Sequence, residues 1–332
     1  MKTLSIIDSA SHEGKEVTLL GWVGTKRDHK KVVFIDLRDK TATVQIVGNE
    51  TLAAVSPEDV VKIVGLVKMR PERLINPNLA TGTVEVEMTS FEILSRAQTL
   101  PIPIDTDGYE IDEEHRLKYR YLDMRRERMT NNIIKRAEAV LWLRNYLAKE
   151  GFTEIETPML TKSTPEGARD FLVPSRLQPG NFYALPQSPQ QYKQMLMVAG
   201  FEKYFQFARC FRDEDPRADR AYGEFTQLDM ELSFVTQEDI MQLTETMFTA
   251  MVTELFPDKK IQQTPWPRIS HKEAQEKYQT DKPDLRKDKD DKSELAFAWV
   301  IDYPLFTPQS KDDFFHGSGD AQLAPSHHMF TS

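Results

Sequence analysis

Two strand-like runs near the middle of the chain, residues 205–212 and 225–233, carry side chains that could do chemistry. Period-2 alternation places the phenylalanines of the first run on one face, and Arg212 with the small and polar residues on the other. In the second run the core-directed set is Thr226, Leu228, Met230, Leu232 and Phe234. The connecting loop holds Arg217 and Arg220 among acidic residues, and so many charges predict a grip on an anion such as a nucleotide phosphate.

A second polar group follows a loop at residues 164–170 and enters a predicted helix through Ser188 and Pro189. A free amino acid with an acidic side chain needs a cation for that carboxylate, an anion for its ammonium group, and amides or hydroxyls that fix its orientation. Candidates for these three needs are, in order, Lys193; Glu166 or Asp229; and Ser188, Gln190 and Gln227. The alternative for Lys193 is a solvated helix lysine.

Two further features invite reactive roles. The single cysteine, Cys210, lies within the first run, where strand packing is the better interpretation than a nucleophile. His327 and His328 suggest a metal, but adjacent histidines point apart on a strand and no further Cys or His lies at ligand spacing. The metal ligands therefore remain unassigned.

The elements that precede these groups begin with five short runs rich in Val, Ile and Phe within residues 1–98. The predicted strands are residues 17–23, 32–37, 43–47, 59–68 and 83–94. Five strands separated by turns are typical of the oligonucleotide-binding (OB) barrel, whose exposed face stacks single-stranded bases.

A basic loop at residues 25–31 leads into the second of these strands. Its cations could hold phosphates while Phe34 stacks a base. The alternatives are a solvated turn, with His29 at its tip, and a core position for Phe34.

Residues 99–114 have the proline and acidic composition of a linker. An amphipathic helix is predicted over 115–128, with a charged face that lies near RNA or faces water. A second helix over 130–150 carries an apolar stripe and ends at Gly151, before a strand and Pro158. The stripe comprises Ile133, Ile134, Ala137, Val140, Leu141, Leu143 and Leu147.

The formal net charge of −9 argues against nucleic-acid binding by bulk electrostatics, so any nucleic acid must meet local patches. No apolar run approaches the ~20 residues that span a bilayer. The N-terminus shows no export or organelle signal, and a single cysteine suits a reducing compartment, so we expect a cytoplasmic protein without a membrane segment.

The combination Phe-Arg-Asp-Glu at 211–214 and Glu-Phe-Thr-Gln-Leu-Asp at 224–229 resembles motif 2 of the class II aminoacyl-tRNA synthetases. Its residues are most similar to those of the bacterial aspartyl enzymes. The helix, strand and Pro158 resemble motif 1, and Gly21-Trp22-Val23 with Phe34-Ile35-Asp36 resemble the anticodon-binding domain. The resemblance implies an α+β fold: an OB-fold barrel at 1–98, a linker at 99–114 and an antiparallel catalytic domain at 115–332.

The resemblance also implies a function. L-Aspartate would react with ATP, accompanied by Mg²⁺, to give aspartyl-adenylate and then aspartyl-tRNA(Asp), and His29 extends the expectation to tRNA(Asn). The implied aspartate contacts are Glu166, Ser188, Gln190, Lys193, Arg212, Gln227, Asp229 and His327, with Arg212 as the catalytic residue. The implied ATP contacts are Arg212, Asp213, Glu214 and Phe225, and the implied anticodon contacts are Arg27, His29, Phe34 and Gln45. Motif 1 implies a homodimer.

The sequence departs from the family chiefly in two places. A short charged run at 287–294 stands where the bacterial enzymes carry a large inserted domain, and no motif 3 segment occurs before Ser332. We therefore expect an incomplete catalytic domain with little activity on its own. The alternative is a non-catalytic tRNA-binding paralogue, although such a protein has no use for an aspartate pocket.

Overall fold

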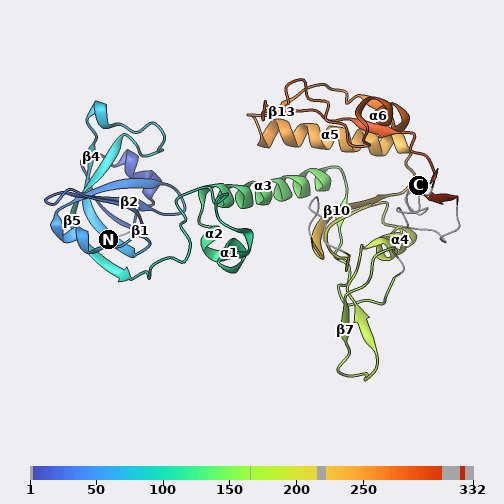
Figure 1. Ribbon diagram of the computed structural model, residues 1–332, viewed down its shortest axis with the longest axis horizontal. Helices are drawn as coiled ribbons and strands as arrows, with labels where there is room; N and C mark the ends of the chain where they lie inside the picture. The colour runs from blue at the N-terminus through green and yellow to red at the C-terminus, as the bar shows by residue number, and fades with distance from the viewer. Residues whose placement is uncertain (1–2, 165, 215–221, 309–321, 326–332) are drawn as a thin grey trace. The chain divides into compact units, whose positions relative to one another are not determined.

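The computed structural model describes residues 3–164, 166–214, 222–308 and 322–325. The chain divides into two compact units, Met1–Thr130 and Asn131–Ser332, and each is described by itself. Figure 1 shows their helices and strands, coloured along the chain.

The first unit is built on a closed barrel of five strands (Figure 1). Around the barrel the order is β1-β2-β3-β5-β4, with β3 and β5 the parallel pair. The strands are β1 (Glu16–Asp28), β2 (Val33–Arg38), β3 (Thr43–Gly48), β4 (Val60–Met69) and β5 (Val84–Ser95). All five predicted strands form, so the predicted barrel is confirmed.

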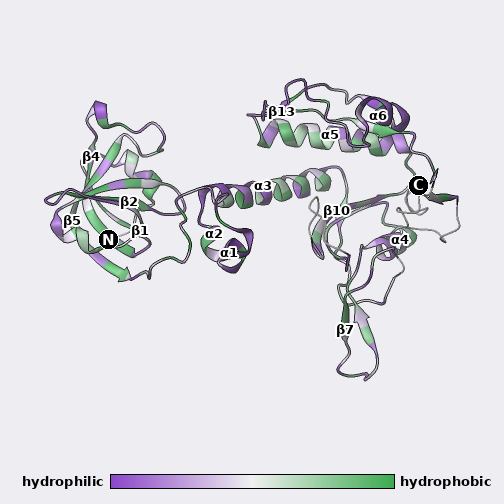
Figure 2. Ribbon diagram, in the orientation of Figure 1, coloured by the Kyte–Doolittle hydropathy of each residue, from purple (hydrophilic) through white to green (hydrophobic). Residues whose placement is uncertain are grey.

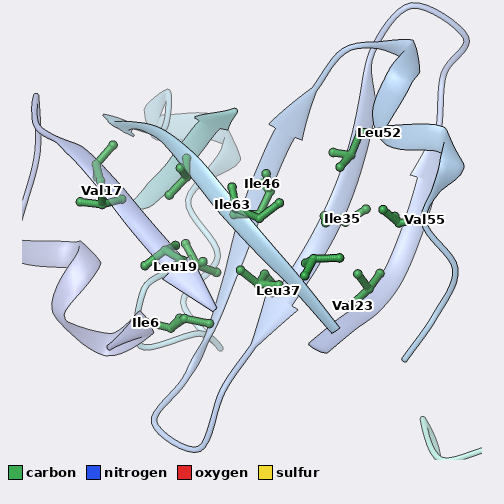
Figure 3. Packing of buried hydrophobic residues seen from close by; sticks show 14 of the residues in the cluster. Ile6, Val17, Leu19, Val23, Ile35, Leu37, Ile46, Leu52, Val55 and Ile63 are labelled. Atoms are coloured by element: carbon green, nitrogen blue, oxygen red, sulfur yellow. The ribbon is translucent and has the colours of Figure 1, made fainter. Parts of the chain in front are cut away.

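Alternate side chains of these strands fill the barrel interior (Figure 3). In β2, Val33, Ile35 and Leu37 are fully buried, whereas Phe34 and Asp36 between them are only half-buried. Burying a side chain of this size contributes about 1.5–3 kcal/mol, so the period-2 pattern strongly determines which residues face outward. A short 3-10 helix, η1 (Ile6–Ser11), adds Ile6 to the same core.

Strand β1 is longer than the sequence predicted. The prediction ended it at Val23, but after a shift in register between Val23 and Lys26 it continues to Asp28, which pairs with Val33 of β2. Such a bulge bends and twists a strand and allows it to continue. The predicted basic loop is therefore partly strand. The His29 N–H donates to the Val32 carbonyl at 3.0 Å and closes the turn.

The prediction of one continuous helix over 115–128 is wrong. Two short helices form instead, α1 (Glu113–Lys118) and α2 (Arg120–Asp123), and they are separated at Tyr119. The buried Asp123 carboxylate accepts hydrogen bonds from Arg116, Arg120 and Arg126 at 3.1, 2.8 and 2.8 Å. Arginines that were expected to face RNA or water therefore hold an internal carboxylate.

Burial alone would raise the pKa of Asp123, but the hydrogen bonds from Arg116 and Arg126 outweigh burial and lower it. Arg126 is itself buried and donates to the carbonyls of Pro103 and Thr106 at 2.6 and 2.9 Å. Arg126 therefore ties the preceding segment, through these two carbonyls, to Asp123 of α2, with which it forms a buried ion pair.

The second unit contains the predicted hairpin. Strands β9 (Lys203–Phe211) and β10 (Glu224–Leu232) pair antiparallel, and β6 (Thr153–Glu154) joins the far side of β9 in parallel. Helix α3 (Glu127–Lys149) precedes β6, and the chain leaves it through Gly151 at φ +83°. Glycine adopts this left-handed conformation without the strain that a Cβ brings.

The aromatic and aliphatic face of the hairpin packs into a core with Leu147 of α3 and Met247 of α5 (Gln237–Leu255). Phe205, Phe207, Leu228, Met230 and Leu232 all belong to this core, which confirms the predicted core-directed face for these residues. Phe234 is the exception. The strand ends at Leu232, and Phe234 stands 96% exposed at φ +60°.

The stripe predicted on α3 is buried only toward the C-terminal end of the helix. Leu143 and Leu147 are buried, but Ile133, Ile134 and Leu141 are 47%, 47% and 61% exposed. In Figure 2 hydrophobic and hydrophilic residues alternate along α3 and α5. None of the helices in the described ranges is both long and apolar enough to cross a membrane.

The remaining elements are short. In the first unit they are η2 (Glu50–Ala54) and η3 (Glu72–Leu74). In the second unit they are β7 (Leu172–Pro174), β8 (Phe182–Ala184), α4 (Gln190–Val198), β11 (Lys260–Ile261), β12 (Arg268–Ser270), α6 (His271–Tyr278), β13 (Glu294–Leu295), β14 (Trp299–Ile301), β15 (Phe306–Pro308) and β16 (Leu323–Pro325).

Candidate functional site

The polar face of the β9–β10 hairpin is built by its register. Phe225 lies opposite Cys210, Gln227 opposite Ala208, and Asp229 opposite Gln206. Because directly paired residues share a face, these six side chains line one surface, opposite the core. The surface combines one aromatic ring, two amides, one carboxylate and a thiol.

Lys193 of α4 reaches this surface as an ion pair. Its Nζ donates to Asp229 Oδ1 at 2.8 Å and lies 3.3 Å from Glu231 Oε2, and its side chain is only 13% exposed. Burial would lower the pKa of Lys193, but the hydrogen bond and charge of Asp229, with the charge of Glu231, raise it instead. Lys193 is therefore a fixed cation, which excludes the solvated helix lysine.

The second carboxylate oxygen of Asp229 does not take part in the ion pair with Lys193. Asp229 Oδ2 is buried and makes no hydrogen bond within the described residues. The Tyr204 hydroxyl is close to Asp229, and burial together with the charge of Asp229 raises the pKa of Tyr204, so this hydroxyl stays neutral. A buried carboxylate oxygen without a partner is costly, and it is a natural acceptor for a ligand cation such as an ammonium group.

Arg212 follows β9 on the same surface. Its guanidinium lies over the Phe225 ring, 5.1 Å from the centroid, and its Nε donates to the Gln187 carbonyl at 3.3 Å. Among the described residues it has no carboxylate partner. A half-buried guanidinium held on an aromatic ring, with free donors, suits a phosphate or carboxylate of a ligand.

Glu166 is brought to this region by its neighbours. Its carboxylate accepts from Ser188 Oγ at 2.5 Å and from Thr164 Oγ1 at 3.1 Å. Ser188 Oγ in turn accepts from the Gln190 backbone N–H at 3.2 Å, but the helix begins at Gln190 with Pro189 as its N-cap, one residue later than predicted. The Gln190 carboxamide makes no hydrogen bond within the described residues.

Two further residues predicted to contact ATP, Asp213 and Glu214, follow Arg212 in the sequence. Asp213 pairs with Arg169 through backbone hydrogen bonding, with the Asp213 N–H donating to the Arg169 carbonyl at 3.0 Å. Glu214 is half-buried next to it. His327, His328, Arg217 and Arg220 lie outside the described residues, as does most of the loop that joins β9 to β10.

The thiol of Cys210 has no sign of reactivity. Its Sγ lies 3.3 Å from Gln227 Oε1, and burial raises its pKa to about 11. A thiol that stays protonated is a poor nucleophile, so the interpretation as strand packing stands.

On the barrel, a polar face crosses four neighbouring strands. Arg27 of β1 donates to Asp36 of β2 and to Gln45 of β3, both at 3.1 Å. Gln45 donates onward to Glu85 of β5 at 3.0 Å. Phe34 lies on the same outward face, since it stands between buried residues of β2. The position of Phe34 excludes a core role.

The turn beside this face holds His29. Its ring meets Phe34 edge-on, with the centroids 5.8 Å apart, and the side chain is exposed. Lys26 does not contribute a free cation to the basic loop at residues 25–31. Its Nζ donates to the carbonyls of Ala53 and Val55 at 3.0 and 2.7 Å, so it caps the end of η2 rather than gripping phosphates.

The sequence reasoning missed three polar residues of these surfaces. Glu231 shares the face of Asp229 by period 2, and that pattern could have identified its pairing with Lys193. Glu85 depends on the parallel pairing of β3 with β5, which the sequence does not reveal. Gln187 has no sequence signal beyond its position before Ser188. Among the described residues, no three metal-ligating side chains converge.

Comparison with known proteins finds a family model for each of the two parts of the chain. Residues 112–332 match the model for tRNA synthetases class II (D, K and N), and residues 17–94 match the OB-fold nucleic acid binding domain. The first of these models covers more than half of the chain.

Curated relatives are similar over most of this chain. The aspartate–tRNA(Asp/Asn) ligase of Dehalococcoides mccartyi (strain CBDB1) is 53% identical over 294 residues, 86% of this chain and 49% of that protein. The ligase of the same name from Paracoccus denitrificans is 50% identical over 284 residues, 84% of this chain and 48% of that protein. The chain spans about half the length of the curated relatives it matches.

Solved structures agree on the fold. Asparaginyl-tRNA synthetase from Pyrococcus horikoshii, complexed with asparaginyl-adenylate, superposes with a TM-score of 0.72 at 25% identity over 86% of this chain and 69% of that one. A putative aspartyl-tRNA synthetase from Leishmania major Friedlin gives 0.69 at 20% identity, over 76% and 52% of the two chains.

Proposed function

This chain belongs to the class II tRNA synthetases of the D, K and N group, and from that premise we propose that it serves as an aspartate–tRNA ligase. L-Aspartate is activated by ATP to aspartyl-adenylate, and the aspartyl group passes to tRNA(Asp) and also to tRNA(Asn). The observation that carries the proposal is the shared surface of Lys193, Asp229 and Arg212, which offers fixed charges of both signs at short range.

The geometry supports a role for each charge. Lys193 receives the side-chain carboxylate of aspartate, and Asp229 with Glu166 receives its ammonium group, with Ser188, Gln190 and Gln227 fixing orientation. The α-carboxylate of aspartate then attacks the α-phosphate of ATP and pyrophosphate leaves, without a protein nucleophile. Positioning and charge compensation by Arg212 supply the catalysis, and Phe225 stacks the adenine.

On the ATP side, Asp213 and Glu214 border the same region. Mg²⁺ accompanies ATP in this family, and where it binds it offsets phosphate charge. No three ligating side chains converge in the described ranges, so the protein ligands of the ion stay unassigned.

On the barrel, Phe34 stacks an anticodon base while Arg27, Gln45 and His29 supply hydrogen bonds. The support is the outward polar face that runs from Arg27 to Glu85 beside the Phe34 ring. Phosphate contacts come from Lys30 and Lys31, which are exposed in the turn, and not from Lys26.

We extend the proposal to assembly and location. The exposed Ile133, Ile134 and Leu141 side chains lie on α3, the motif 1 helix, and support homodimer formation through it. The free Cys210 and the match to synthetases support a cytoplasmic protein.

Arg212→Ala tests the catalytic assignment in the complete protein. Removing a group that stabilises developing charge costs about 10²–10³ in rate, so we expect that loss in aspartate-dependent ATP–pyrophosphate exchange. The dissociation constant for tRNA, measured by filter binding, should change far less. Equal losses in both would remove Arg212 from this role, and tRNA binding without exchange in the unsubstituted protein would favour the non-catalytic paralogue.

Arg209→Ala is the matched control. Arg209 also lies on β9, but its side chain is on the opposite face of the strand from that of Cys210 and Arg212. It is half-exposed and pairs with Glu224. Its loss should leave the exchange rate nearly unchanged.

A further inference from the structure

Gln187 is a buried carboxamide that clamps the loop over residues 166–170. It is 1% exposed. Its Oε1 accepts from the Ala168 N–H at 3.0 Å, while its Nε2 donates to the Ala168 carbonyl at 2.9 Å and to Asp170 Oδ1 at 2.5 Å. Both polar groups of one loop residue are thus satisfied by one side chain, much as a neighbouring strand would satisfy them.

The clamped loop carries Glu166. Gly167, between Glu166 and Ala168, has φ +100°, a conformation that favours glycine and directs the chain back toward Gln187. The next residue after Gln187 is Ser188, whose hydroxyl donates to Glu166. Two consecutive residues, Gln187 and Ser188, therefore hold the loop backbone and the loop carboxylate.

Gln187 also touches the opposite side of the site through its backbone. Its carbonyl accepts from Arg212 Nε at 3.3 Å, which orients the guanidinium over Phe225. A displacement of Gln187 would therefore shift an anion-binding and a cation-binding group together. No other described residue is hydrogen-bonded both to the loop at 166–170 and to Arg212.

We infer that Gln187 is a positioning residue, which sets the distance between Glu166 and Arg212 and thereby the fit of the amino-acid substrate. This role in substrate binding rests on the proposed function, in which Glu166 and Arg212 contact aspartate. The clamp itself is a property of the chain without ligand, so the two can be tested separately.

The first measurement concerns the loop alone. Gln187→Met keeps the side-chain length but removes both hydrogen-bonding groups, so the Ala168 N–H loses its acceptor. Amide hydrogen exchange of the ligand-free protein should be faster by roughly tenfold in the 166–171 peptide. Gln178→Met, in the exposed turn between β7 and β8, is the matched control and should leave that peptide unchanged. Unchanged exchange in Gln187→Met would overturn the clamp.

The second measurement concerns substrate. In the complete protein, Gln187→Met should raise KM for aspartate about tenfold and lower kcat, while KM for tRNA stays the same. A purely structural role would reduce activity in proportion to the folded fraction with KM for aspartate unchanged, and that result would contradict the inference. If the unsubstituted protein shows no aspartate-dependent exchange, the proposed function fails, and with it the substrate role of Gln187, whatever the loop does.

A third variant separates hydrogen bonding from packing. Gln187→Glu sets a second carboxylate against Asp170, and two carboxylates at this distance share a proton, which raises the pKa of one of them. The loop should be loose above that pKa and tighten as the pH falls and the shared proton bridges the pair. A loop defect in Gln187→Glu that does not lessen at low pH, after correction for intrinsic exchange, would count against the clamp.

Discussion

At the scale of single residues, Lys193 shows how one cation organises a polar surface. It lies between Asp229 and Glu231, which are 10% and 31% exposed, and neither carboxylate has another cation within 4.0 Å among the described residues. Two neighbouring carboxylates repel each other, and partial burial strengthens the repulsion. Lys193 therefore stabilises the folded chain through its own ion pairs, and it can also offer its charge to a ligand.

Lys193→Met should lower the free energy of unfolding by about 3 kcal/mol at pH 8, the low end of the range for breaking a buried pair. The raised pKa of Lys193 means that its contribution is fully present below about pH 10.5 and is lost as the pH rises through the folded value. The loss should therefore be about equal at pH 6 and pH 8, both of which lie well below the pKa of Lys193. Urea unfolding at these two pH values measures it.

Lys135→Met is the control for that series. Lys135 forms an exposed pair with Glu138 on α3, at 52% and 46% exposure, and such pairs contribute at most about 0.5–1 kcal/mol. A loss for Lys193→Met no larger than that for Lys135→Met, or one that grows as the pH falls, would contradict a stabilising role for the shared cation.

At the scale of elements, the alternation of β1 sets the barrel. Leu19 is fully buried in the core, whereas the adjacent Leu20 is 38% exposed on the outer face. We expect Leu19→Ala to cost about 3 kcal/mol, because it leaves a cavity in a closed barrel, and Leu20→Ala to cost under about 1 kcal/mol. Hydrogen exchange of barrel peptides over a urea series gives both values. Equal costs would mean that the two faces of β1 are not distinct.

The same alternation explains which elements could be predicted from the sequence. The strands of the barrel and the two strands of the hairpin were found because Val, Ile and Phe recur with period 2 between clear turn residues. The polar face at Gln227 and Asp229 follows directly from that period, whereas the residues alone left a core position open for Phe34 and only the resemblance favoured an outward one.

Other features depend on contacts that are distant in sequence. The helix predicted over 115–128 breaks at Tyr119, where arginines of both pieces converge on Asp123, and local propensity carries no sign of that convergence. Phe234 continued the apolar period, yet the strand had already ended. Gln187 was missed because its partners lie 17 and 19 residues away in a loop. Period alone specifies a face, but not where an element stops.

At the scale of the whole molecule, the chain pairs two kinds of chemistry on two units. The barrel unit presents an aromatic ring and a polar row suited to bases, and the second unit presents paired charges suited to an amino acid and a phosphate. Under the proposed function, the first unit selects the tRNA and the second selects the amino acid. A change in the barrel should therefore alter which tRNA is charged without altering aspartate activation.

The choice of tRNA tests this division in the complete protein. Aspartate and asparagine tRNAs differ at the third anticodon base, and His29, exposed beside Phe34, can donate or accept a hydrogen bond according to its tautomer. We expect comparable aspartylation of both tRNA transcripts by the unsubstituted protein. His29→Leu removes the adaptable group, so it should shift the ratio of kcat/KM toward tRNA(Asp) by about five- to tenfold, the value of one hydrogen bond.

His12→Leu is the control, since His12 also lies in the first unit but bonds to the Asp8 carbonyl at the end of η1, away from the polar row. It should leave the ratio of the two tRNAs unchanged, and neither variant should alter the rate of aspartate-dependent ATP–pyrophosphate exchange. A strong preference of the unsubstituted protein for tRNA(Asp) that His29→Leu does not change would exclude His29 as the group that reads the third base. A fall in exchange with His29→Leu would contradict the division of labour between the two units.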